Sequence, residues 1–220
     1  MKVFIKALIF TLFLIPSVSW AFYTHHDTGE ILKVSQYKLG LGTQIITDPK
    51  TYSGTGFFGY LDSGLDDGAN VRVNLGVGSE VFHTGVFYKW VPYPDYGEQP
   101  AMGIRIGASY SRYNGESEIS LRAHPFVSKK FKTEFGDIDA YSALQLGIRG
   151  YKDSTTVPAQ LSFGGELKTS YYDSTLFTGE IGVNMAKAFT YISIGIIFYV
   201  DDNKDYQLEN PLKYLRKKNK

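Results

Sequence analysis

Between residues 30 and 200 the sequence repeats one pattern, in which apolar residues alternate with polar residues or glycine. In residues 71–78, for example, one face is entirely aliphatic, while the other carries Arg72, Asn74 and two glycines. Successive side chains of a β-strand point to opposite faces, so a period of two residues predicts strands with one apolar and one polar face. No segment in this range has the period of an amphipathic helix. The sequence therefore predicts an all-β protein.

Turn-forming residues divide the alternating region into about ten predicted strands. These strands cover residues 30–47, 53–62, 69–78, 80–91, 100–112, 116–128, 136–151, 156–171, 174–186 and 188–200. Chain reversals are expected at residues 62–64 (Asp-Ser-Gly) and 66–68 (Asp-Asp-Gly), because these residue types favour turns. Phe57 and Phe58 interrupt the alternation of the second segment. If that segment is a loop, or if two segments merge, the number of strands is eight.

The polar face distinguishes a soluble barrel from a membrane barrel. A soluble barrel fills its interior with large aliphatic side chains, whereas an outer-membrane barrel turns its apolar face to lipid and its polar face to the lumen. The polar positions here carry charges of both signs, as an internal ion-pair network requires. The sequence therefore predicts a single antiparallel up-and-down transmembrane β-barrel.

Two sets of residues follow from this prediction. The expected lumen-facing charged network consists of Lys38, Arg72, His83, Lys89, Arg105, Glu118, Arg122, Arg149, Glu166, Lys168 and Glu180. The residues expected to face lipid are Leu39, Leu41, Val71, Val73, Leu75, Val77, Ile104, Ile106, Leu161, Phe163, Ile194, Ile196 and Phe198.

The first 21 residues have the pattern of a secretory signal peptide. Lys2 and Lys6 come before an apolar run over residues 7–16. The small residues Ser19 and Ala21 then have the spacing that signal peptidase requires. The apolar run is shorter than the ~20 residues of a spanning helix. We expect cleavage after Ala21, followed by a periplasmic segment over residues 22–29 in which the two adjacent histidines are flexible.

The last predicted strand carries a recognisable motif. Ser193 is followed two positions later by Gly195, and hydrophobic residues follow at Phe198 and Val200. This pattern resembles the terminal motif of bacterial outer-membrane β-barrel proteins, without pointing to one particular family. The resemblance implies assembly by the barrel-assembly machinery and residence among outer-membrane lipids. Such barrels usually end at this motif, whereas here a basic tail follows over residues 201–220, in which Asn-Pro at 210–211 is able to start a short helix.

The sequence offers no catalytic motif. His25, His26, His83 and His124 lack the spacing of a metal site. The Asp-x-His element of omptin proteases and the His-x-Ser element of lipid A deacylases are also missing. We therefore expect no catalytic residue, no metal and no cofactor, and His83 is the histidine we single out for testing.

Charge and composition narrow the function further. The formal net charge is only +1 with acids and bases interspersed, so we expect no nucleic-acid partner. The leading hypothesis is a structural or narrow-pore (porin-like) outer-membrane protein, either monomeric or a homo-oligomer joined through its apolar outer faces. An outer-membrane enzyme acting on lipid A or peptides, and a soluble periplasmic ligand-binding β-barrel, stay open as alternatives.

Overall fold

The computed structural model describes residues 24–48, 52–78, 81–113, 116–151, 154–169 and 175–201. The expected cleavage site after Ala21 and residues 202–220 of the basic tail lie outside these ranges. Regular structure within the ranges consists of β-strands alone. None of the described residues forms a helix that is long and apolar enough to cross a membrane.

The chain forms eleven strands. They are β1 (Gln36–Asp48), β2 (Tyr52–Asp66), β3 (Ala69–Gly78), β4 (Val81–Tyr93), β5 (Ala101–Tyr113), β6 (Glu116–Thr133), β7 (Gly136–Tyr151), β8 (Ser154–Thr156), β9 (Ala159–Thr169), β10 (Thr175–Ala186) and β11 (Tyr191–Asp201).

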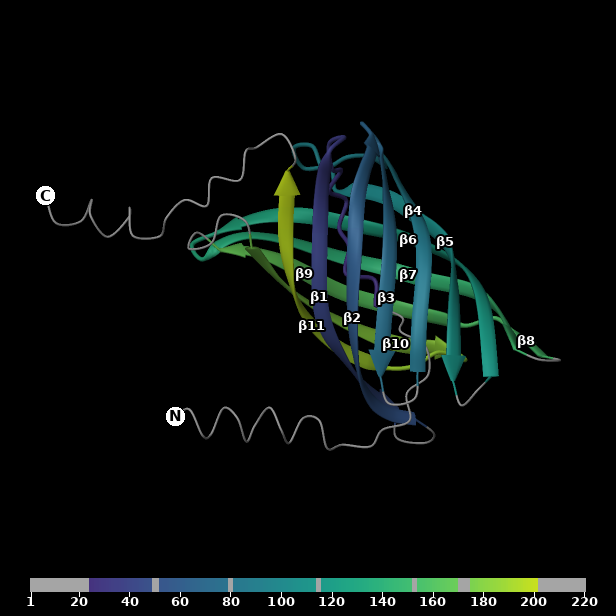
Figure 1. The fold of residues 1–220 in the computed structure, drawn as a ribbon. Helices are drawn as coiled ribbons and strands as arrows, with labels where there is room; N and C mark the ends of the chain where they lie inside the picture. The colour runs from purple at the N-terminus through teal and green to yellow at the C-terminus, as the bar shows by residue number, and fades with distance from the viewer. Residues whose placement is uncertain are drawn as a thin grey trace, which may run out of the picture.

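Ten of these strands form one closed antiparallel ring (Figure 1). Each strand from β1 to β7 pairs with the next one along the chain. β9 pairs with β7 and with β10, β10 pairs with β11, and the pairing of β11 with β1 closes the ring. The short β8 pairs only with the end of β7. The predicted all-β, ten-stranded antiparallel barrel is thus confirmed, and β8 is an addition to it.

The largest differences from the predicted boundaries are in β1, in β2 and in β6, which runs to Thr133 instead of ending at residue 128. β1 begins at Gln36 rather than at residue 30, because residues 30–35 leave the barrel wall. β2 continues through residues 62–64, so the reversal predicted there is wrong, whereas the reversal predicted at residues 66–68 is confirmed by the turn at residues 67–68. Within β2 the two adjacent phenylalanines point to opposite sides: Phe57 is exposed and Phe58 is buried. An aromatic ring suits either side of this wall, so the interrupted alternation does not interrupt the strand.

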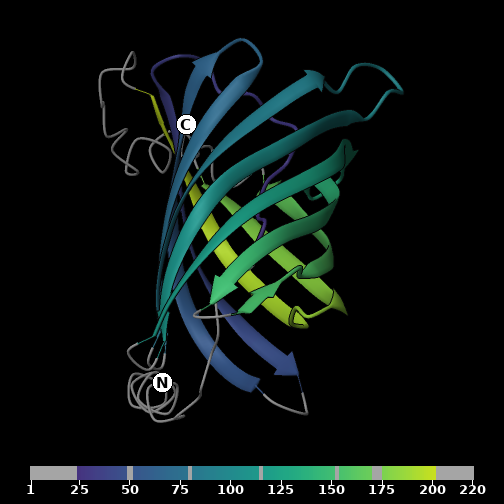
Figure 2. The ribbon, with the colours of Figure 1, turned by 90° about the vertical axis from the view of Figure 1, so that its right-hand side faces the viewer.

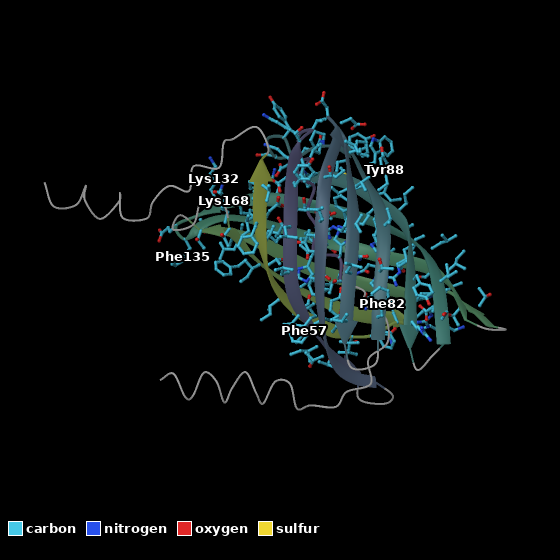
Figure 3. All side chains as sticks on the ribbon, in the orientation of Figure 1. Phe57, Phe82, Tyr88, Lys132, Phe135 and Lys168 are labelled. Carbon is cyan, nitrogen blue, oxygen red and sulfur yellow. The ribbon has the colours of Figure 1, made fainter. Side chains whose placement is uncertain are left out.

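The polarity of the wall is inverted relative to a water-soluble barrel. Val73, Leu75 and Val77 are 44–55% exposed, while Arg72 and Arg105 are 4% and 2% exposed. Figure 3 shows Phe57 and Phe82 projecting from the outer surface. A monomeric soluble protein rarely leaves a continuous apolar surface of this extent in contact with water, whereas a barrel in lipid requires one.

The ring is strongly skewed. β1 to β4 run nearly upright in Figure 1 and β7, β9 and β10 cross behind them, and the view turned by 90° shows the same two crossing halves (Figure 2). In both views the first described residues, drawn in purple, run inside the ring before β1 begins. The barrel interior is therefore occupied by the chain itself.

Candidate functional site

The candidate site is the barrel interior, where residues 24–35, hereafter the lumen segment, meet the polar face of the wall. His25, His26, Asp27 and Thr28 are each no more than 2% exposed. The expectation that the two histidines are flexible is wrong, and residues 24–29, which we assigned to a periplasmic segment, lie inside the barrel. The physical reason is that their backbone groups find charged partners on the wall.

Glu180 of β10 anchors the beginning of the lumen segment. Its carboxylate accepts the backbone N–H groups of His25 (2.7 Å) and His26 (2.8 Å). The hydroxyls of Tyr141 and Tyr191 donate to the same carboxylate. His26 has a φ of 38°, a left-handed conformation that is uncommon outside glycine, and two successive N–H groups converge on the anion there. Charge-assisted hydrogen bonds of this kind are stronger than neutral ones.

Asp27 binds a cluster of three wall cations, Arg72 of β3, Lys89 of β4 and Arg105 of β5, hereafter the cation cluster. Lys89 Nζ lies 2.8 Å from Asp27 Oδ1, Arg105 pairs with Oδ2, and Arg72 lies 3.7 Å from Oδ1. Burial alone would raise the pKa of Asp27, but Arg105, Lys89 and Arg72 outweigh that effect and hold the pKa well below its usual value. The side chain is therefore a carboxylate over the whole physiological pH range.

The cation cluster also binds the backbone of the lumen segment. Arg72 and Arg105 both donate to the carbonyl of His25, at 2.8 and 2.9 Å. Lys89 donates to the carbonyls of residues 28 and 30, at 3.1 and 2.6 Å. Main-chain carbonyls left unpaired in a barrel interior would be costly, so these bonds hold the segment in an irregular, extended path.

A second ion-pair group lies where the lumen segment approaches β1. Lys38 Nζ is 2.7 Å from Glu166 of β9 and 3.4 Å from Glu30 of the segment. The hydroxyl of Tyr199 of β11 also donates to Glu30. Burial by itself would raise the pKa of Glu30, but Lys38 and the Tyr199 hydrogen bond lower it. The segment is thus held by ion pairs at two places along its length.

His26 adds a neutral contact. Its Nδ1 lies 2.8 Å from Thr178 Oγ1 and its Nε2 2.5 Å from Ser193 Oγ. Complete burial lowers the pKa of His26 from 6.5 to about 4, and Arg72, Arg105 and Lys38 act in the same direction against the opposing effect of Glu180. The ring is therefore neutral near pH 7.

The residues of the predicted charged network are placed as follows. Those that are buried are Lys38, Arg72, His83, Lys89, Arg105, Glu118, Arg122, Glu166 and Glu180. Arg149 is partly exposed and lies 3.7 Å from Glu118. Lys168 is exposed near the end of the β6–β7 hairpin (Figure 3) and is not part of the buried group, because β9 ends one residue later.

The residues predicted to face lipid all lie at least partly exposed. Leu39, Leu41, Val73, Leu75, Val77, Ile106, Phe163, Ile194, Ile196 and Phe198 are 37–62% exposed, and Val71, Ile104 and Leu161 are intermediate. These positions are consistent with contact with hydrocarbon chains.

Sequence reasoning missed the acids that complete the interior. Asp27 and Glu30 belong to the lumen segment, and Asp62 of β2 forms a two-point ion pair with Arg72. A signal for them exists in the sequence: in the predicted network bases outnumber acids, and a buried network needs compensating charge. That excess is consistent with further acids in the interior, although it does not identify them.

Two small cavities are lined in part by polar side chains of the interior. One cavity, lined by residues that include Thr24, Tyr60 and His83, has about 10 Å³ for the centre of a water molecule, which is room for one water. A second cavity of the same free volume lies near His124 and Gln160.

Within the described ranges, no group of three or more His, Cys, Asp or Glu residues is placed to hold a metal ion. His83, singled out above, is buried with Nδ1 2.9 Å from Ser111 Oγ.

Comparison with known proteins supports the fold. The sequence matches no family model and no curated protein. The structure is similar to that of an outer membrane channel from Pseudomonas putida F1, with a TM-score of 0.51 and 7% identity over 81% of this chain and 100% of that chain. A de novo designed transmembrane β-barrel gives a TM-score of 0.40 and 13% identity, over 78% of this chain and 100% of the design. The chain has the fold of a transmembrane β-barrel.

Proposed function

We propose that this protein is an integral outer-membrane β-barrel that acts as a narrow pore, and that its own lumen segment closes the pore in the state described here. The proposal rests on the way in which the lumen segment is held inside the barrel. The segment is held by hydrogen bonds and ion pairs to a polar wall, through Glu180, the cation cluster and Lys38.

A polar wall is compatible with both a closed and a water-filled lumen. If the lumen segment leaves, Arg72, Lys89, Arg105 and Glu180 exchange protein partners for water, a change that polar groups tolerate and apolar cores do not. Within the described residues, the segment joins the wall at Gln36, where β1 begins, and its backbone bridge from Val34 to Gly64 of β2 lies next to that point. It can therefore swing out without breaking the ring of strand pairs.

The width of a ten-stranded barrel limits the solute. Barrels of about eight strands have interiors that side chains nearly fill, and aqueous porin channels require about 16. A ten-stranded ring with long charged side chains inside therefore suits ions and small polar solutes. Large-solute passage is outside the proposal.

Planar-bilayer conductance of the full-length protein tests the proposed pore. We expect the wild type to be closed most of the time with small, brief openings. Asp27→Asn removes the charge that pairs with the cation cluster and should raise the open probability at least about tenfold, since loss of one partner of a buried ion pair costs several kcal/mol. Glu98→Gln, a charge-matched change at an exposed site, should leave it unchanged. A folded Asp27→Asn protein that inserts and stays silent would exclude the pore.

The outer surface and the last strand suggest the partners of such a barrel. The exposed aliphatic surface would contact outer-membrane lipids, and Ser193, Gly195, Phe198 and Val200 would serve the barrel-assembly machinery during biogenesis. The proposal includes no enzymatic step. Packing of several barrels through their outer faces into a homo-oligomer is compatible with it, and cross-linking in detergent would distinguish the monomer from the oligomer.

A further inference from the structure

We infer that the cation cluster of Arg72, Lys89 and Arg105 is a binding site for small carboxylates, and that Asp27 occupies it as a tethered ligand that soluble carboxylates displace. This inference rests on the proposed pore and deepens it, because it names the class of solute that the lumen selects.

The geometry around Asp27 is that of a bound carboxylate. The two oxygens are engaged by different cations, Oδ1 by Lys89 at 2.8 Å and Oδ2 by Arg105. All four side chains are no more than 4% exposed. Arg105 gives one terminal nitrogen to Asp27 and the other to the carbonyl of His25. The site therefore offers a separate cation to each of the two carboxylate oxygens.

The wall does not neutralise the cluster by itself. Arg72 is paired with Asp62, through two contacts of 2.5 and 2.6 Å. For Lys89 and Arg105, Asp27 is the sole carboxylate within ion-pair distance in the described part of the chain. When the lumen segment leaves, the wall keeps two cations without an anion. Uncompensated cations facing a narrow lumen attract anions from solution.

The cluster retains a donor that Asp27 does not use. Arg105 Nε is buried and has no hydrogen-bond partner within the described residues, while its two terminal nitrogens donate to the His25 carbonyl and to Asp27. A ligand with more oxygens than a single aspartate side chain would find that donor. This favours small organic acids with two carboxylates over chloride.

Competition with Asp27 lowers the apparent affinity of the cation cluster for soluble carboxylates. Asp27 and a soluble carboxylate compete for the same cations, so the apparent affinity of the soluble acid is reduced by the fraction of barrels in which the site is free. Removing the charge of Asp27 lifts this competition. Binding should then become tighter although the wall is unchanged.

Calorimetric titration of the folded, full-length protein in detergent with succinate tests the inference. The proteins are the wild type, Asp27→Asn, and Asp27→Asn combined with Arg105→Gln, and migration of unboiled samples on a gel verifies that each barrel is folded. We expect Asp27→Asn to bind succinate at least about tenfold more tightly than the wild type. Adding Arg105→Gln should weaken that binding at least about tenfold. Should this double variant fail to fold, Lys89→Gln takes the place of Arg105→Gln.

Three results would overturn the inference: no saturable succinate binding to folded Asp27→Asn, equal binding with and without the wall substitution, or tighter binding of inorganic phosphate than of succinate at equal ionic strength. Lys129→Gln, which removes a partly exposed lysine paired with Asp95, is the matched control and should not change succinate binding. Binding in detergent requires no conduction. A protein that binds succinate but never conducts therefore contradicts only the pore, and one that conducts without binding contradicts only the carboxylate site.

Discussion

His26 and Ser193 join the two ends of the described chain, because Nε2 of the histidine lies 2.5 Å from the serine hydroxyl. Ser193 belongs to the motif expected to direct assembly, yet in the folded barrel its side chain is 2% exposed and faces the lumen. Phe198 of the same motif is 37% exposed on the other face. One strand thus supplies both an outer surface and a contact for the lumen segment.

Release of the lumen segment should increase as the pH falls from 7.5 to 5. The pKa of His26 is about 4 in the barrel, whereas a released histidine titrates near 6.5. Between these values the released form binds more protons, so docking is fully favoured above pH 6.5 and is lost as the pH falls towards 4. The expected loss at pH 5 is about 2 kcal/mol, or about 30-fold. Asp27 stays ionised throughout this window, so its ion pairs do not change.

The measurement is the rate at which a water-soluble maleimide modifies a cysteine introduced by Thr28→Cys, since the chain has no cysteine of its own. Each rate is divided by that of Glu98→Cys at the same pH, which removes the pH dependence of thiol reactivity. Combining Thr28→Cys with His25→Phe and His26→Gln should flatten the profile, because the pKa of His25 is also lowered by burial. A normalised rate that falls on acidification would refute the explanation.

Gly182→Ala should weaken the barrel by about 1–3 kcal/mol, the usual cost of overpacking. A Cβ at Gly182 would lie 2.1 Å from the ring of Tyr191, its partner on β11, and this ring must keep its place for its hydroxyl to reach Glu180. Gly179→Ala is the control on the same strand, since its Cβ would have no neighbour within 3.9 Å. The temperature at which the folded gel band disappears should fall for the first variant only, and equal midpoints would count against the Tyr191 contact.

Ile194→Arg should hinder folding into lipid vesicles. Ile194 is 62% exposed and pairs with Thr43 and Gly179 in the middle of the neighbouring strands. A lipid-facing arginine near the bilayer midplane costs about 2–4 kcal/mol. Urea titration in vesicles measures the loss, with Ile194→Leu as the control. Unchanged stability would mean that this face does not meet hydrocarbon.

The strands were predictable because lipid and lumen impose opposite polarity on alternate residues. The alternation of Arg72 with Val71 and Val73 is a direct consequence of that constraint. The start of β1 was not predictable in the same way. Residues 30–35 are also a mixture of apolar and polar residues, but Leu32 is buried against the interior and its N–H donates to Asn70. A local pattern does not tell a wall strand from a segment that enters the lumen.

The lumen segment escaped prediction for a related reason. Irregular chain held by side chains of several strands needs no period, so nothing local marks His25 or Asp27. Their partners, Glu180 and Arg105, lie 155 and 78 residues away in the sequence. The excess of bases over acids in the predicted network is the one sequence feature that implies further interior acids, and it does not identify the residues.

Occupation of the lumen by residues 24–35 is the central claim, and modification of Thr28→Cys at pH 7.5 tests it most directly. Thr28 is fully buried, whereas Glu98 is exposed between β4 and β5. In the folded barrel the maleimide should modify Glu98→Cys rapidly and Thr28→Cys at least about a hundredfold more slowly, and denaturation should make the two equal. Equal rates in the folded protein would contradict a lumen closed by its own chain.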